Sequence, residues 1–491
     1  MIRRGFVTFV LIGLILSLLT LVAWRAVDMK TTLLPDVVSA TLDADEPVET
    51  IESPSGPVLH VPAPPPENQT KTRVLERPLF VVGLGWDRLA PALLANAGKA
   101  PSKASSFSPS GLAVSVAPVD GLPDVIEALA RGGGQEQGAD VAIVPLPQWL
   151  AAQDKLQAID PVVFYVAGWS HGREAVFGAP RADVAAPDDA RPVRVGFKDI
   201  GPAYLALFGF DAEGITPPDI SLIGADADPA PSWQAVDVID FEASTRSDVR
   251  PSMRWTTSQA SGLIPIVMVA SRSWTETHPK ALVAWLRGWL SGVGEVSGKV
   301  AEAARQLGRM DGAPQPLRLM RGLETWEPCS LKENLALFEL DGPDAQPLRL
   351  VMRRTWNLLN RSQLAAPVPR ALPISADIVK AASRARLPTD VGGTTAWSGV
   401  SVADETTGGQ HVVLTRPLDD IDGYELAREL AALGGAFPSS VLRVTPKKKN
   451  GPVQTAFELA RALSSVPQTV VLADPNPDLS TAATIEVLLA P

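Results

Sequence analysis

Short polar loops follow several apolar runs of this sequence, and their residues could bind a small polar ligand. Trp86 and Asp87 follow the first run. Trp169 and Ser170 follow a later run, residues 162–166, in a predicted turn that begins at Gly168. Hydrogen-bonding and aromatic side chains at strand ends are well placed to enclose a ligand, because rigid strands fix the position of their exit loops. The full candidate set is Trp86, Asp87, Trp169, Ser170, Asp199, Gly201, Ser244 and Thr245.

Several of these residues also have an ordinary structural explanation. Trp86 and Trp169 are equally well explained as packing residues. Asp87 and Asp199 suit helix caps, because a short carboxylate accepts hydrogen bonds from the free amides of a first helical turn. Such free amides also attract anions and polar head groups. Only the shared position at strand ends makes the set a candidate site.

The sequence carries no pattern typical of catalysis, metal binding or nucleic-acid binding. Ser170 and His171 are neighbours, but consecutive side chains of an extended segment point to opposite faces and form no nucleophile-base pair. The four histidines lie far apart, and Cys329 is the one cysteine, which favours a small buried hydrophobe. A formal net charge of −10 disfavours phosphate backbones. We expect no enzyme activity, cofactor or metal, and no nucleic-acid partner.

The elements that must position the loops alternate between strand and helix, which predicts an α/β fold. The clearest example spans residues 263–293. Residues 266–270 are an uncharged apolar run typical of a strand buried on both faces. Pro279 predicts a helix start, and apolar residues from 282 to 293 recur at three- and four-residue spacing on one helix face. The carboxyl ends of such strands line the ligand cleft in open α/β sheets.

This stretch resembles periplasmic solute-binding proteins of the nitrate, sulfonate and taurine type. The matching residues of the helix are His278, Pro279, Ala281, Val283, Leu286, Gly288, Trp289 and Gly292. Residues 138–146, GADVAIVPL, are similar to the first lobe of that family. The resemblance covers about residues 78–384 and implies a two-lobed type 2 binding protein. It also implies a small polar or anionic solute between the lobes and an ABC-type permease as partner.

The first 77 residues predict a membrane anchor and a tether. Residues 6–24 form an uncharged apolar run of bilayer length behind Arg3 and Arg4. We therefore expect residues 1–30 to be a single-pass anchor in a bacterial inner membrane, with the bulk of the chain in the periplasm. A cleaved signal peptide is the alternative, although no good cleavage site follows the run. Residues 31–77 are acidic and proline-rich, which is typical of a linker.

The tail predicts a small separate domain. Residues 385–410 resemble a second linker, and residues 411–491 alternate strand and helix, with a helix over residues 425–433 that Gly434 and Gly435 should end. This order is similar to OmpA-like domains, which hold peptidoglycan, and Arg461 matches the arginine that binds the peptide carboxylate in them. Lys447, Lys448 and Lys449 stand where the family has an acidic motif. The resemblance therefore implies an α+β fold with weak contact to peptidoglycan or an envelope protein.

Two functions remain open from the sequence. The first is a membrane-tethered solute-binding protein for ABC-type uptake or sensing. The second is a non-catalytic envelope scaffold whose binding-protein fold has lost its ligand. A working cleft should be open and lined by polar groups, whereas side chains should fill a ligandless one.

Overall fold

The computed structural model describes residues 73–178, 192–228, 231–240, 252–341, 346–393, 411–419, 423–448, 453, 455–458 and 470–489. All of them belong to one unit, Pro62–Pro491. The helices of these ranges include none that is long and apolar enough to cross a membrane. The anchor predicted at residues 6–24 lies outside the described residues, so it stays a prediction.

Six strands of the described chain form a first sheet, in the order β11-β4-β10-β3-β1-β2. They are β1 Leu79–Leu84, β2 Val114–Val119, β3 Val141–Pro145, β4 Pro161–Ser170, β10 Pro265–Ser271 and β11 Trp326–Pro328. β1 runs parallel to β2 and β3, while β10 is antiparallel to β3 and β4. All residues of β10 from Pro265 to Ala270 are buried, which confirms the predicted central strand. An uncharged apolar run has no polar face to keep in water.

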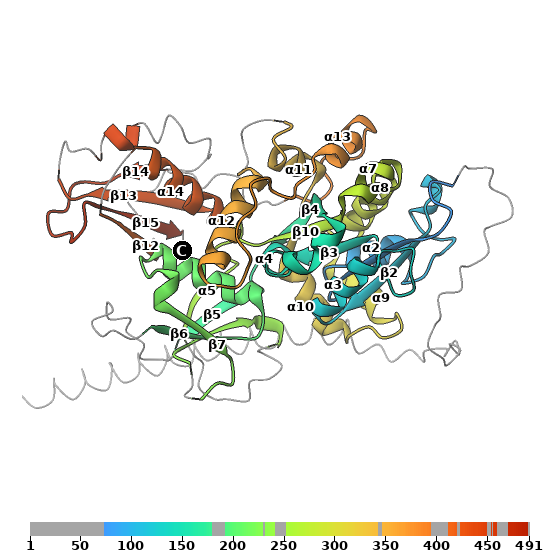
Figure 1. The fold of residues 1–491 in the computed structure, drawn as a ribbon, viewed down its shortest axis with the longest axis horizontal. Helices are drawn as coiled ribbons and strands as arrows, with labels where there is room; N and C mark the ends of the chain where they lie inside the picture. Colours follow the sequence, from blue (N-terminus) through green and yellow to red (C-terminus); the bar gives the residue numbers. More distant parts are fainter. Residues whose placement is uncertain are drawn as a thin grey trace, which may run out of the picture. The chain divides into compact units, whose positions relative to one another are not determined.

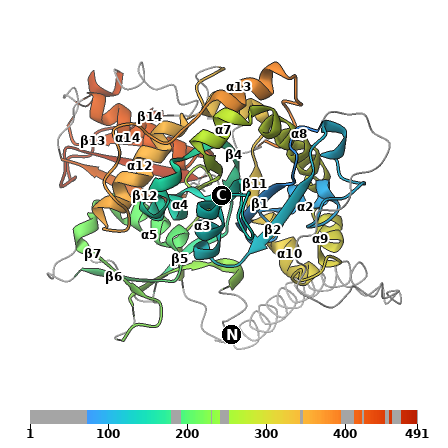
Figure 2. The same cartoon turned by 45° about the vertical axis from the view of Figure 1, so that its right-hand side comes forward.

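The helix predicted after Pro279 is α8, Pro279–Val296. Its apolar residues at three- and four-residue spacing are all buried, as predicted: Leu282, Trp285, Leu286, Trp289, Leu290 and Val293. Trp285 contacts the sheet by donating to the sulfur of Met268 in β10 at 3.3 Å. α8 also packs on α2, Ala90–Asn96, and both views show the two helices side by side (Figures 1 and 2). Burial of each large side chain contributes about 1.5–3 kcal/mol.

Glycines allow α8 to approach its neighbours closely. A Cβ at Gly292 would lie 1.8 Å from the carbonyl oxygen of Pro91 in α2, and one at Gly288 would lie 2.1 Å from the Phe107 ring. Phe107 in turn stacks on Trp285 with ring centroids 5.2 Å apart. Two residues of the predicted motif are thus small because another part of the chain touches the helix backbone there.

Five strands of the described chain form a second sheet, in the order β7-β6-β8-β5-β9. They are β5 Glu174–Gly178, β6 Val193–Phe197, β7 Ile220–Gly224, β8 Trp233–Asp237 and β9 Ser252–Thr256. We call the first sheet with its helices the first lobe, and the second sheet with α5, Ile200–Ala212, the second lobe. The predicted α/β class and the two lobes are therefore present.

The chain crosses between the lobes twice, from β4 to β5 and from β9 to β10. Thr257 of the second crossing ties the two crossings together. Its hydroxyl oxygen accepts from the backbone amides of Gly172 at 2.9 Å and Glu174 at 3.2 Å. We refer to these two hydrogen-bonded connections, residues 171–174 and 257–264, as the hinge region.

The remaining α-helices of the described chain cover the sheets. They are α3 Leu122–Arg131, α4 Leu146–Ala151, α7 Arg272–Thr277, α9 Val300–Gly308, α10 Pro316–Glu324, α11 Leu331–Leu337, α12 Leu348–Arg361, α13 Asp377–Arg384 and, in the tail, α14 Gly423–Ala436.

Cys329 is fully buried, as the sequence predicted, and this burial raises the pKa of its thiol well above the ordinary value.

Four strands in the tail form a third sheet, in the order β12-β15-β13-β14. They are β12 His411–Leu418, β13 Ser440–Pro446, β14 Val470–Leu472 and β15 Ala483–Leu489. β13 and β14 are parallel, and the other pairs are antiparallel. The sequence predicted a helix stop at Gly434 and Gly435, but α14 continues to Ala436. The glycine there serves a close approach instead, because a Cβ at Gly435 would lie 2.1 Å from Gln346 Oε1.

Candidate functional site

A cavity of about 470 Å³ lies between the two lobes. The loops after β1, β2, β6 and β8 line it, together with the start of α4, the start of β5 and one side of α10. Its polar and charged lining residues are Asp87, Arg88, Asp120, Gln148, Arg173, Glu174, Lys198, Asp199, Asp237, Asp240 and Arg318. The carboxyl ends of strands from both sheets thus meet at one cavity, as the sequence predicted.

Arg173 joins the two lobes across this cavity. It lies just before β5 of the second lobe, and its Nη1 donates to Asp87 Oδ2, which follows β1 of the first lobe. Its Nε donates to Asp237 Oδ2 at the end of β8, at 2.6 Å. All three side chains are 15% exposed or less. We refer to Asp87, Arg173 and Asp237 as the interlobe bridge.

The charges of the interlobe bridge stabilise one another. Burial alone would lower the pKa of Arg173, but the carboxylates of Asp87 and Asp237 outweigh it, so this pKa is raised. Burial opposes ionisation of Asp237 as well, yet Arg173 and Arg88 hold its pKa below the ordinary value. Arg173 and Asp237 therefore remain charged at neutral pH.

A second buried pair lies beside the bridge. Arg88 Nη2 is 3.8 Å from Glu174 Oε1, and both residues are almost fully buried. Glu174 Oε2 accepts from the hydroxyls of Ser170 and, at 3.1 Å, of Thr257 in the hinge region. Burial is the main cause that raises the pKa of Glu174, and burial together with repulsion from Arg173 lowers that of Arg88.

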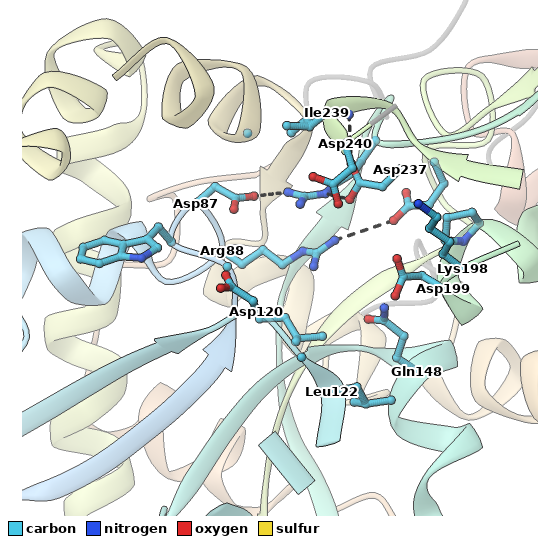
Figure 3. Close-up of a pocket in the computed structure, with 18 of the residues that line it drawn as sticks. Asp87, Arg88, Asp120, Leu122, Gln148, Lys198, Asp199, Asp237, Ile239 and Asp240 are labelled. Atoms are coloured by element: carbon cyan, nitrogen blue, oxygen red, sulfur yellow. Dashed lines mark hydrogen bonds and ion pairs between the residues drawn. The ribbon is translucent and has the colours of Figure 1, made fainter. Parts of the chain in front are cut away.

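Other polar groups of the cavity have no partner among the described residues. The Oε1 atom of Gln148 and the Nε atom of Arg88 are buried without a hydrogen bond. The carboxylate of Asp199 directly precedes α5 but accepts no capping hydrogen bond there, which excludes the helix-cap explanation. Asp199 and Gln148 point toward one another in Figure 3, below the Arg88 side chain that reaches across the cavity.

Three of the predicted site residues line the cavity, namely Trp86, Asp87 and Asp199. Trp86 is largely buried, and Lys99 Nζ lies 5.5 Å from the centroid of its ring, in cation-π geometry. Asp87 is part of the interlobe bridge rather than a helix cap. Gly201 sits behind the cavity wall, where a Cβ would lie 3.5 Å from Glu174 Oε1.

Trp169 and Ser170, which the sequence placed in the candidate set, do not line the cavity. Both belong to β4, which continues through the predicted turn because β10 and β11 pair with it on its two sides. Gly168 permits this pairing, since a Cβ there would lie 2.3 Å from the carbonyl oxygen of Glu327 in β11. Trp169 is a buried packing residue, and Ser170 acts indirectly by donating to Glu174.

Ser244 and Thr245 lie outside the described residues, and so does Arg461 of the tail. The sequence placed a strand at residues 236–241, whereas β8 ends at Asp237. The strand therefore ends earlier than predicted, and residues 238–240 are helical. The cavity residues here are Asp237, at the end of β8, and Ile239 and Asp240, which follow it.

Sequence reasoning missed most of the charged lining. The strand-end rule itself points to Asp120, which follows β2, and to Arg88 and Lys198, which adjoin predicted residues. No local signal marks Arg173, Glu174 or Arg318, because only the fold brings the hinge region and α10 to the cavity. No group of three or more His, Cys, Asp or Glu residues in the described ranges could hold a metal ion.

No protein-family model and no curated protein sequence matches the chain. Solved structures with similar folds include the alkanesulfonate-binding protein SsuA from Xanthomonas axonopodis pv. citri bound to MOPS, at 15% identity and a TM-score of 0.42, covering 60% of this chain and 97% of that one. The aliphatic sulphonate-binding protein SsuA from Escherichia coli matches at 14% identity with a TM-score of 0.42, covering 67% of this chain and 98% of that one. The nitrate-binding protein NrtA from Synechocystis PCC 6803 matches at 14% identity with a TM-score of 0.44, covering 63% of this chain and 88% of that one.

Proposed function

We propose that the protein is a solute-binding module that encloses a small polar ligand between its two lobes. The cavity between the lobes carries this proposal, because it has room for a small molecule and its lining is rich in polar groups from both lobes. A binding fold that had lost its ligand should have filled this space with side chains. Instead, Gln148 and Asp199 leave hydrogen-bonding capacity unused there.

In this proposal the module is tethered at the periplasmic face of a bacterial inner membrane. The apolar run at residues 6–24 and the acidic, proline-rich stretch that follows support the tether. The module would deliver its ligand to an ABC-type permease or report its concentration to a sensor. The tail would act as a degenerate OmpA-like domain with weak affinity for the cell wall, since Lys447 and Lys448 replace the acidic half of the motif.

A ligandless envelope scaffold is the second candidate, and the interlobe bridge favours it. Arg173 joins Asp87 of the first lobe to Asp237 of the second lobe through the protein's own side chains. A module whose lobes are joined in this way would present a constant surface to a partner protein. The two candidates differ in whether a small molecule occupies the cavity.

Native mass spectrometry of the full chain, purified in detergent from its own host, tests the proposal. We expect a small-molecule adduct that is lost in Leu122→Trp, because Leu122 lines the cavity and an indole would fill part of its volume. Ala130→Trp adds the same indole to an exposed position on the same helix, α3, and should keep the adduct. An adduct-free wild-type spectrum would favour the scaffold, and equal adducts in both variants would place the ligand elsewhere.

A further inference from the structure

The lining of the cavity carries more negative than positive charge. Its six carboxylates are Asp87, Asp120, Glu174, Asp199, Asp237 and Asp240, and its four cations are Arg88, Arg173, Lys198 and Arg318. A desolvated cavity with an excess of carboxylates attracts cations and repels oxyanions. The composition of the site is therefore opposite to what an anionic solute requires.

Three of the four cations are already committed to carboxylates. Arg173 holds Asp87 and Asp237 in the interlobe bridge, and Arg88 faces Glu174. Arg318 on α10 pairs with Asp240 at 2.5 Å. Within the described part of the chain, the lining groups that form no ion pair are Lys198, Asp120 and Asp199.

Other carboxylates of the cavity repel the carboxylate of Asp199. The pKa of Asp199 is raised, first by partial burial and then by repulsion from Asp237 and Asp240, which together outweigh the attraction of Arg88 and Arg173. The carboxylate receives no compensating hydrogen bond from the amides of α5 that follow it. A cation next to Asp199 would remove this repulsion, whereas an anion would add to it.

Gln148 provides an independent indication of the ligand. Its side chain is only 8% exposed, and its Oε1 atom is a buried hydrogen-bond acceptor without a donor. Figure 3 shows it on the same side of the cavity as Asp199. A primary ammonium has three N–H donors and no acceptor, so it can donate to a carboxylate and an amide oxygen at once.

We propose that the ligand carries an ammonium group, which binds between the carboxylate of Asp199 and the amide oxygen of Gln148. This inference rests on the proposed function and specifies its ligand class as a small organic amine. Of the small polar or anionic solute that the resemblance implied, it excludes the anionic class. Asp120 supplies a further unpaired carboxylate to the same cavity.

Calorimetric titration of the full chain in detergent, at fixed ionic strength, tests the ligand class. The probes are 1,4-diaminobutane, its neutral analogue 1,4-butanediol, methanesulfonate and nitrate. We expect binding of the diamine alone. Asp199→Asn should weaken that binding about ten- to hundredfold, as expected for loss of one charge-assisted hydrogen bond. Gln148→Met should weaken it about two- to tenfold, because a neutral acceptor is lost.

Two controls separate the site from general electrostatics and from misfolding. Asp154→Asn makes the same change at an exposed position outside the cavity and should leave diamine binding unchanged. Thermal unfolding of Asp199→Asn without any probe should occur at the same or a higher temperature, because the substitution removes repulsion from Asp237 and Asp240.

Several outcomes would overturn the proposal. They are binding of nitrate or methanesulfonate without the diamine, an equal loss in Asp199→Asn and Asp154→Asn, and no diamine heat at millimolar concentration. Each of them leaves the proposed function intact if the native mass spectrum still contains a small-molecule adduct. That function fails separately, when the spectrum of the wild-type chain has none.

Discussion

Replacing Arg173 with methionine should destabilise the protein strongly. The substitution leaves Asp87 and Asp237 buried in the cavity without their cation. Removal of one partner from a buried ion pair costs about 3–5 kcal/mol, because the remaining charge is still desolvated. We therefore expect the free energy of unfolding at pH 7 to fall by about 3–5 kcal/mol, measured by urea unfolding with tryptophan emission as the signal.

The cost should come from the orphaned carboxylates rather than from the shape of the methionine side chain. The triple variant Asp87→Asn, Arg173→Met, Asp237→Asn removes all three charges, and we expect it to recover most of the lost stability. Arg349→Met is the matched surface control. Its guanidinium lies 2.6 Å from Glu339, similar to the Arg173–Asp237 distance, but both side chains are about half exposed. This control should cost less than about 1 kcal/mol.

The same variant should have a characteristic pH dependence. In the wild type the lowered pKa of Asp237 contributes stability above the unfolded pKa of about 3.9, and this contribution is lost as the pH falls through the folded value. Without Arg173, the burial of Asp237 loses its main opposing charge, so the folded pKa of Asp237 rises. The resulting penalty is absent below about pH 3.9 and grows as the pH rises. The difference between wild type and Arg173→Met should accordingly shrink from pH 7 to pH 4.

A loss below about 1 kcal/mol in Arg173→Met would refute this reasoning, as would a difference that stays constant between pH 7 and pH 4. Either result would mean that water reaches the interlobe bridge and screens it. No recovery in the triple variant would assign the loss to packing of the arginine stem.

Two further predictions concern α8 and the anchor. Gly292→Ala should lower the free energy of unfolding by about 1–3 kcal/mol in urea, because its Cβ would meet the Pro91 carbonyl oxygen. Gly294→Ala on the same helix meets only Val391, at 3.6 Å, and should be neutral or stabilising. Equal effects of the two variants would contradict the close approach of α2 and α8. Alkaline phosphatase fused after Pro78 should be active in cells, because Arg3 and Arg4 precede one apolar span, and an inactive fusion would contradict the predicted topology.

The strongest sequence predictions were those that depend on one local pattern. The uncharged run predicted the buried strand β10, and the apolar spacing predicted the buried face of α8. The structure confirms both predictions. The predicted end of a strand or helix was wrong where a glycine was interpreted as a turn or as a helix stop. Gly168 and Gly435 both lie inside regular elements, because another segment passes within contact distance of each. That segment is remote in sequence, so no local pattern contains the information.

The candidate site was predictable as a place and not as a set of charges. The rule that ligands bind at strand ends located Asp87 and Asp199 at the cavity. The charge balance depends on Arg173 and Glu174 in the hinge region and on Arg318 in α10. Their pairing with residues up to 86 positions away decides which carboxylates remain for a ligand. The resemblance implied a small polar or anionic solute, and the charges of the cavity support our proposal of an amine rather than an anion.

The strand order of the first sheet has a consequence for biosynthesis. β10 lies between β3 and β4, although the whole second lobe separates it from them in sequence. The second lobe is one continuous stretch and can complete its sheet while the inner edges of β3 and β4 are still unpaired. At about 5–20 residues per second, those edges wait roughly 5–20 s for β10 to be synthesised. Open strand edges invite pairing with other chains, so the nascent first lobe passes through an aggregation-prone interval that a chaperone would need to cover.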